Sequence, residues 1–94
     1  MFREISLCFL AGLMAANAVP HFVRGITKER FPSLVGNGPL PNLLAGWSGL
    51  VLAAVLSWTA AVDHAVAGVA AAFVGALVIG VFHATHGAFG RSET

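Results

Sequence analysis

Apolar residues fill three long, nearly unbroken stretches of this chain, at about residues 5–23, 43–62 and 65–82. An α-helix rises about 1.5 Å per residue, so each stretch gives a helix close to the roughly 30 Å thickness of a bilayer's hydrocarbon core. None of the stretches carries the polar stripe that marks a surface helix of a soluble protein. The pattern therefore predicts an all-α, integral membrane bundle of three transmembrane helices.

The two connections between these stretches differ in length, and the difference predicts how the helices are arranged. Residues 24–40 contain charged residues, a breaker cluster at 36–39 and several apolar side chains, a mixture that is typical of an interfacial loop. Residues 63–64 leave room only for a very short turn. The second and third helices should thus form an antiparallel hairpin, and residues 1–94 a single transmembrane domain.

Composition agrees with a membrane location. Hydrophobic residues make up 57% of the chain and charged residues only 10%, whereas charged residues make up about 25% of a typical soluble domain. The net charge of +1 and the lack of a large basic patch argue against a nucleic-acid partner. We expect membrane lipid to be the direct environment of the helices.

Basic residues lie mainly on one side of the predicted spans. The N-terminus and the turn at 63–64 share one side, which has Arg3 alone. The long loop and the C-terminus share the other side, which has Arg24, Lys28, Arg30 and Arg91. Since Lys and Arg accumulate on the cytoplasmic side of membrane proteins, the N-terminus is predicted outside and the C-terminus inside.

Small residues recur every four positions along the second and third spans. This spacing lets helix backbones approach closely, which is a main source of attraction between helices in lipid. The positions are Gly49 and Ala53 on the second span and Gly68, Ala72, Ala76 and Gly80 on the third, with a parallel row at Ala67, Ala71 and Gly75. Two rows on one helix exceed the needs of a single neighbour, so the pattern predicts a homo-oligomer or a subunit of a larger membrane complex.

Polar residues within the spans gather at the predicted cytoplasmic level. Asn17 and His21 share a face of the first helix, His83 and His86 share a face of the third, and Asn42 opens the second. The three histidines are sufficient for a metal site with one open position, for axial ligation of haem, or for a proton relay. The other interpretation is that these residues only form hydrogen bonds between helices or face the lipid headgroups, and the sequence does not identify a cofactor.

Pro20 interrupts the first span near its cytoplasmic end. Its ring removes a backbone donor and frees the carbonyl of Ala16. We expect a kink or a local loosening of the helix at this point.

Residues 17–25 read Asn-Ala-Val-Pro-His-Phe-Val-Arg-Gly. This run resembles the N-x-x-P-H-F-x-x-G block of uncharacterised small bacterial inner-membrane proteins. In that group a Phe-Pro pair and a polar loop follow, and then a helix that opens with Asn; the matching parts here are residues 31–33 and 42–47. The resemblance implies a bacterial inner membrane and a plan of three or four helices, and it adds weight to Asn17 and His21.

The sequence shows no catalytic signature: it has no nucleophile elbow, no phosphate-binding glycine loop and no pair of carboxylates inside the spans. We therefore expect no enzymatic activity. Two hypotheses follow for function. The first is a small polytopic membrane protein that acts through helix–helix association; the alternative is a metal-, haem- or proton-handling protein that uses the histidine cluster.

Overall fold

Three helices make up most of the computed structural model, which describes residues 1–60 and 63–86. They are α1 (Phe2–Ile26), α2 (Pro39–Ala60) and α3 (Ala65–His86). Each helix is long and apolar enough to cross a membrane. The predicted all-α class with three membrane-spanning helices is confirmed, and the chain is a small polytopic membrane protein.

The helices extend beyond the apolar stretches from which they were predicted. α1 gains a few residues at both ends of the stretch 5–23, α2 begins four residues before position 43, and α3 continues from position 82 to His86. Hydrogen bonding along a helix does not stop where hydrophobicity does, so the more polar end turns remain helical. The predicted end of the second span at 62 lies outside the described residues, as does Arg91.

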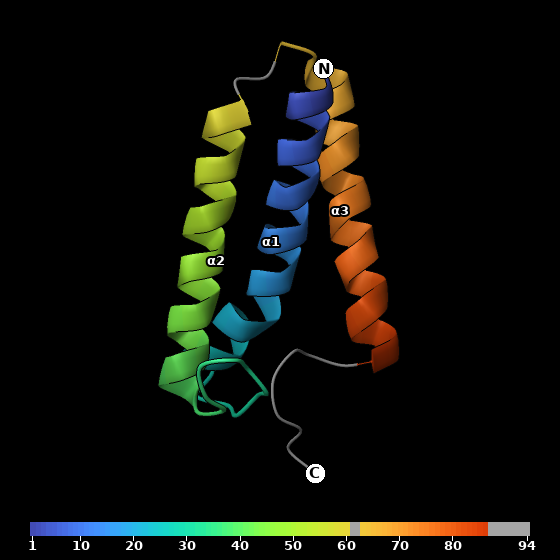
Figure 1. The fold of residues 1–94 in the computed structure, drawn as a ribbon. Coiled ribbons are helices and arrows are strands. Elements are labelled where there is room, and N and C mark those ends of the chain that lie inside the picture. Colours follow the sequence, from blue (N-terminus) through green and yellow to red (C-terminus); the bar gives the residue numbers. More distant parts are fainter. Residues whose placement is uncertain (61–62, 87–94) are drawn as a thin grey trace.

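α1 lies between the other two helices (Figure 1). It packs against both α2 and α3, whereas no described residue of α2 has its Cα atom within 8 Å of one in α3. α2 and α3 run antiparallel, as the short connection requires, but they do not pack directly on each other. A short connection fixes the directions of two helices, and here the third helix occupies the space between them.

Glycines place the α1 backbone in direct contact with both neighbours. A Cβ atom added to Gly75 of α3 would overlap the carbonyl oxygen of Phe9, and one added to Gly46 of α2 would overlap the backbone of Phe22. A Cβ atom added to Gly12 of α1 would overlap the backbone of Ala72, and one added to Gly25 would overlap the backbone of Leu43. Such close approach maximises dispersion contacts between helices, which is the main attraction available in lipid.

Most of the small residues predicted for helix packing face α1. Gly68 and Ala53 are buried, and Gly49 approaches the side chain of Ala18. Ala72 and Ala76 are half-buried, with Ala72 lying against Gly12. The row thus serves packing within the chain, except at its far end. There, Gly80 is exposed and a Cβ added to it would meet no atom within 4 Å.

The last turns of α1 lie toward α2 and away from α3 (Figure 1). The helix continues through Pro20 to Ile26, so proline does not end it. The contacts of Phe22 with Gly46 and of Gly25 with Leu43 hold this segment against α2. Beyond Pro20, α1 and α3 therefore separate.

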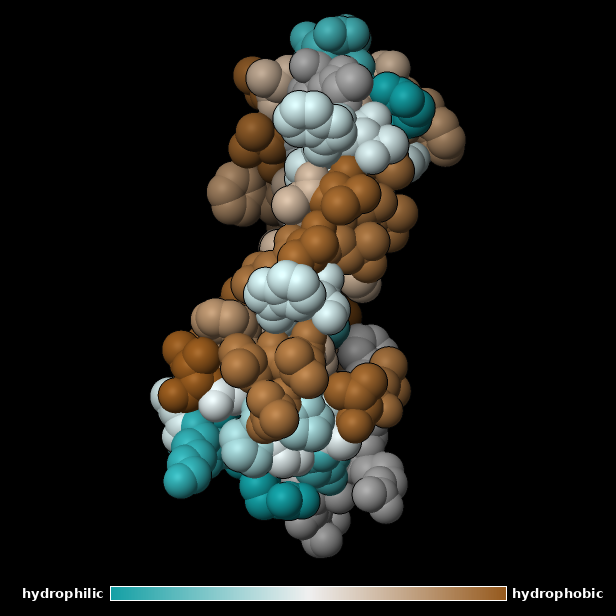
Figure 2. All heavy atoms as spheres, turned by 90° about the vertical axis from the view of Figure 1, so that its left-hand side faces the viewer, coloured by the Kyte–Doolittle hydropathy of each residue, from teal (hydrophilic) through white to brown (hydrophobic). Residues whose placement is uncertain are grey.

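The outer surface over α2 is apolar along its middle and hydrophilic at both ends (Figure 2). Trp58 is exposed in the last turn of α2, with 88% of its surface accessible, and Trp47 is exposed in the third turn, with 58% accessible. Amphipathic indole rings collect at the two membrane–water interfaces. This distribution of polarity is the one expected of a helix that spans a bilayer.

The glycine contacts yield a direct test of the packing. We expect Gly75→Ala to lower the free energy of unfolding by about 1–3 kcal/mol, because the added methyl group forces α1 and α3 apart. Gly80→Ala should be neutral or stabilising by up to about 1 kcal/mol, because alanine is the better helix former. Reversible unfolding in mixed detergent micelles measures both, and equal effects would contradict the α1–α3 contact.

Candidate functional site

Polar side chains connect all three helices near the loop end of the bundle, and this set is the candidate site. His21 of α1 and Asn42 of α2 form its centre: Nδ1 of His21 lies 2.7 Å from Oδ1 of Asn42. His21 is 5% exposed and Asn42 is fully buried. The ring of His21 also meets the ring of Phe31 edge-on, with centroids 5.3 Å apart.

Asn42 joins the helices to the loop at 27–38. Its Nδ2 donates to the carbonyl oxygens of Phe31 at 2.7 Å and Gly38 at 2.9 Å. Carbonyl oxygens only accept, so the amide must present its NH₂ group to them and its oxygen to His21. In the neutral ring, the proton of His21 therefore resides on Nδ1, which donates to Asn42 Oδ1, and Nε2 carries the lone pair.

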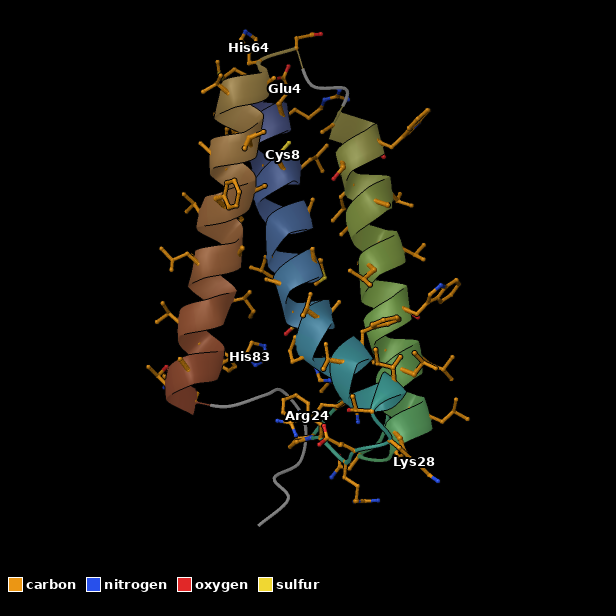
Figure 3. The ribbon with its side chains drawn as sticks, turned by 180° about the vertical axis from the view of Figure 1, so that it is seen from behind. Glu4, Cys8, Arg24, Lys28, His64 and His83 are labelled. Atoms are coloured by element: carbon orange, nitrogen blue, oxygen red, sulfur yellow. The ribbon has the colours of Figure 1, made fainter. Side chains whose placement is uncertain are left out.

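A second pair connects α1 to α3. Nε2 of His83 lies 2.7 Å from Oδ1 of Asn17. His83 points from α3 toward the interior of the bundle (Figure 3). Asn17 and His21 lie one turn apart on α1, so successive turns of this helix bind α3 and α2 in the same way, through a histidine–asparagine bond.

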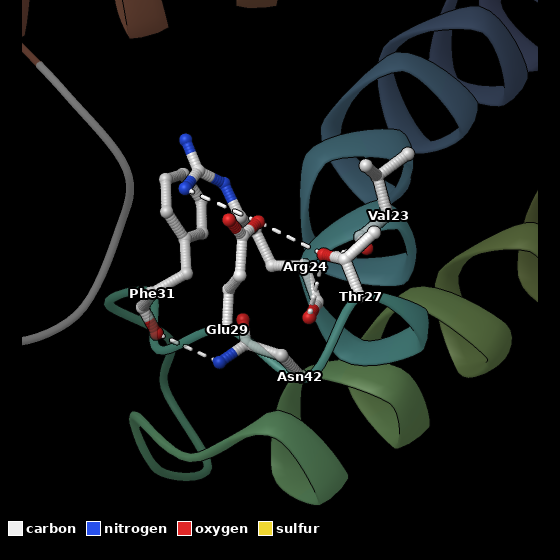
Figure 4. A network of polar contacts seen from close by, with 6 residues as sticks. All are labelled: Val23, Arg24, Thr27, Glu29, Phe31 and Asn42. Atoms are coloured by element: carbon white, nitrogen blue, oxygen red, sulfur yellow. Dashed lines mark hydrogen bonds and ion pairs between the residues drawn. The ribbon is translucent and has the colours of Figure 1, made fainter.

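Charged and aromatic side chains close the loop end below these pairs (Figure 4). Arg24 lies 3.5 Å from the carboxylate of Glu29 and over the ring of Phe31, 5.0 Å from its centroid. Thr27 donates to the Val23 carbonyl and also contacts Glu29. The two charged side chains are about half exposed, so the ion pair adds little stability. The ring of Phe31 thus lies in contact with both Arg24 and His21.

The opposite end of the bundle is held by two neighbouring residues of α1. Arg3 donates to the carbonyl of Ala60 at the end of α2, at 3.1 Å. The buried carboxylate of Glu4 accepts from the backbone N–H of His64 and lies 3.1 Å from Nδ1 of the same residue. Figure 3 shows Glu4 and His64 together at this end. α1 thereby supplies a carboxylate to the positive end of the α3 dipole.

The three histidines that were predicted to form one cluster each contact different residues. His86 is exposed, lies 2.7 Å from the Thr85 hydroxyl and stacks on Phe82, with ring centroids 5.3 Å apart. His21 and His83 bind asparagines instead. Within residues 1–60 and 63–86, no group of three His, Cys, Asp or Glu side chains is placed to hold a metal ion. Metal or haem binding by His21, His83 and His86 stays a prediction.

Sequence reasoning identified the members of the site but not their pairing. Asn17, His21, Asn42 and His83 were all expected at one level, and the structure places them there. The roles of Phe31, Gly38 and Glu4 were missed. A signal for Glu4 is present in the sequence, since an acidic residue in an apolar first turn needs a partner across the bundle.

Comparison with known proteins gives no match to a family model, a curated protein or a solved structure. The resemblance of residues 17–25 to small bacterial inner-membrane proteins stays an expectation.

Asn42 should be the most sensitive polar position in the protein. Asn42→Ala removes three hydrogen bonds and leaves buried partners unsatisfied, so we expect a loss of about 2 kcal/mol or more of folding free energy. Asn17→Ala removes one interhelical bond, that to His83, and should cost about 1 kcal/mol. Unfolding in mixed micelles compares the two variants, and a larger loss for Asn17→Ala would contradict the central place of Asn42.

Proposed function

We propose that this protein acts through helix–helix association in the membrane, as a homo-oligomer or as an accessory subunit of a larger membrane complex. The observation that carries the proposal is the open end of the small-residue row on α3. Gly80 follows Ala76 by one turn and is exposed, with no atom near the position of a missing side chain.

A glycine in the middle of a helix lowers helix stability by about 1 kcal/mol relative to alanine. If such a glycine has no packing partner, nothing within the chain offsets this loss of stability. By contrast, Gly12, Gly25, Gly46 and Gly75 each face the backbone of a neighbouring helix. Gly80 lies on a face of α3 that α1 does not cover: the neighbouring Ile79 is buried, whereas Gly80 is exposed. A helix of a second protein chain, packed against Gly80, would supply the close backbone contact that this chain does not make itself.

Charge and polarity support a particular placement of the assembly. We place the loop end, with Arg24, Lys28 and Arg30, in the cytoplasm of a bacterium and the Arg3 end outside the inner membrane. The proposal includes no catalytic step.

A bulky residue at the open end of the row tests this function. We expect Gly80→Leu to shift the protein to smaller assemblies, since the isobutyl group keeps a second backbone away. Native mass spectrometry of gently released membrane complexes measures the distribution and identifies whether the partners are copies or other subunits.

Two control variants separate loss of association from loss of fold. Gly80→Ala changes the same position minimally, and Ala54→Leu adds the same bulk to an exposed site on α2. Both should retain the wild-type assembly. An unchanged mass distribution for Gly80→Leu, or a wild-type protein that is monomeric in its membrane, would refute the proposal.

A further inference from the structure

A cavity of about 230 Å³ lies at the loop end of the bundle, beside the candidate site. Its walls come from three places: the second half of α1, the loop and the first half of α2. Most of the wall is apolar, with Met14, Leu34, Val35 and Ala45 among the lining residues. Three polar residues, Asn17, His21 and Ser33, also line it.

Asn17 and His21 each have a side-chain nitrogen that makes no hydrogen bond within the described residues. His21 supplies an acceptor. Its Nδ1 donates to Asn42, and this bond fixes the neutral tautomer because both N–H groups of Asn42 are used by carbonyl oxygens. The lone pair is then on Nε2. Among the described residues, the Asn42 bond is the one hydrogen bond that His21 makes. A ring that is 5% exposed thus offers an acceptor next to a cavity.

Ser33 has its hydroxyl group in use, and Asn17 has its side-chain oxygen in use. Ser33 donates its hydroxyl hydrogen to the Gly36 carbonyl and accepts from the backbone N–H of Val35. Asn17 Oδ1 accepts from His83. A molecule that enters the cavity therefore finds apolar walls, one acceptor in the imidazole nitrogen of His21 and one donor in the side-chain NH₂ group of Asn17. A hydroxyl group matches this pair, because it both donates and accepts.

We propose that this cavity binds a small membrane-soluble molecule with an aromatic ring and a phenol-type hydroxyl, which donates to His21 Nε2. The volume is below the roughly 300–1,000 Å³ of pockets for drug-sized ligands, so it accommodates a single-ring head group. The Met14 thioether and the side chains of Leu34 and Val35 suit the ring. An imidazole lone pair suits an acidic hydroxyl. The inference is independent of the association proposed above.

Two probes of nearly equal shape test the hydrogen bond. We would add 4-propylphenol or its methyl ether, 4-propylanisole, to protein in lipid nanodiscs and follow the ¹⁵N signals of the histidine rings, with His21 assigned through His21→Gln. The phenol should shift the His21 signal in a saturable manner, and the ether should bind at least tenfold more weakly. A shift that does not saturate, or equal binding of both probes, would overturn the proposal.

The second part of the test uses variants whose larger side chains fill the cavity. Ala45→Leu places bulk in the cavity without changing His21, and should abolish the saturable shift. Ala70→Leu adds the same bulk at an exposed position of α3 and should leave the shift unchanged. Should Ala45→Leu fail to fold, Val35→Phe provides a second filling from the loop. Undiminished phenol binding in a folded, filled variant would place the probe elsewhere and refute the site.

Discussion

A polar side chain in the hydrocarbon region has no water to bond to, so it has to find its partner on a neighbouring helix. In this protein, α1 carries two such side chains, Asn17 and His21, on successive turns of one face. Each bonds to a different neighbour, Asn17 to His83 of α3 and His21 to Asn42 of α2. The two bonds require α1 to contact α2 and α3 at the same level of the bundle.

Close backbone approach and polar bonding reinforce one another. Side chains as short as asparagine reach across an interface only where the helices are near, and glycines such as Gly46 and Gly75 allow that proximity. The same geometry accounts for the other end of the bundle, where Arg3 and Glu4 reach the end of α2 and the start of α3. α1 is thus connected to both neighbours at two levels, with glycine contacts between them.

The sequence was sufficient to predict what depends on local pattern. Three apolar stretches predicted the three helices, and the short connection predicted that α2 and α3 run antiparallel. The common depth of Asn17, His21, Asn42 and His83 in the membrane followed from their places within the predicted spans. The position of α1 between the hairpin helices could not be predicted, since both neighbours of α1 offer small-residue faces of similar quality. The pairing of each histidine depends on that order, which is why one cluster was expected where two separate pairs exist.

The most direct test of the account is whether α1 separates α2 from α3. Disulfide formation between cysteines reports such proximity. Oxidation should cross-link native Cys8 to Ala71→Cys, because both positions belong, together with Ala60 of α2, to one buried cluster. In a Cys8→Ala background, the pair Ala53→Cys and Ala72→Cys should stay reduced, although these positions would face each other in a directly packed hairpin. Efficient cross-linking of that second pair within a monomer, without the first, would contradict the central position of α1.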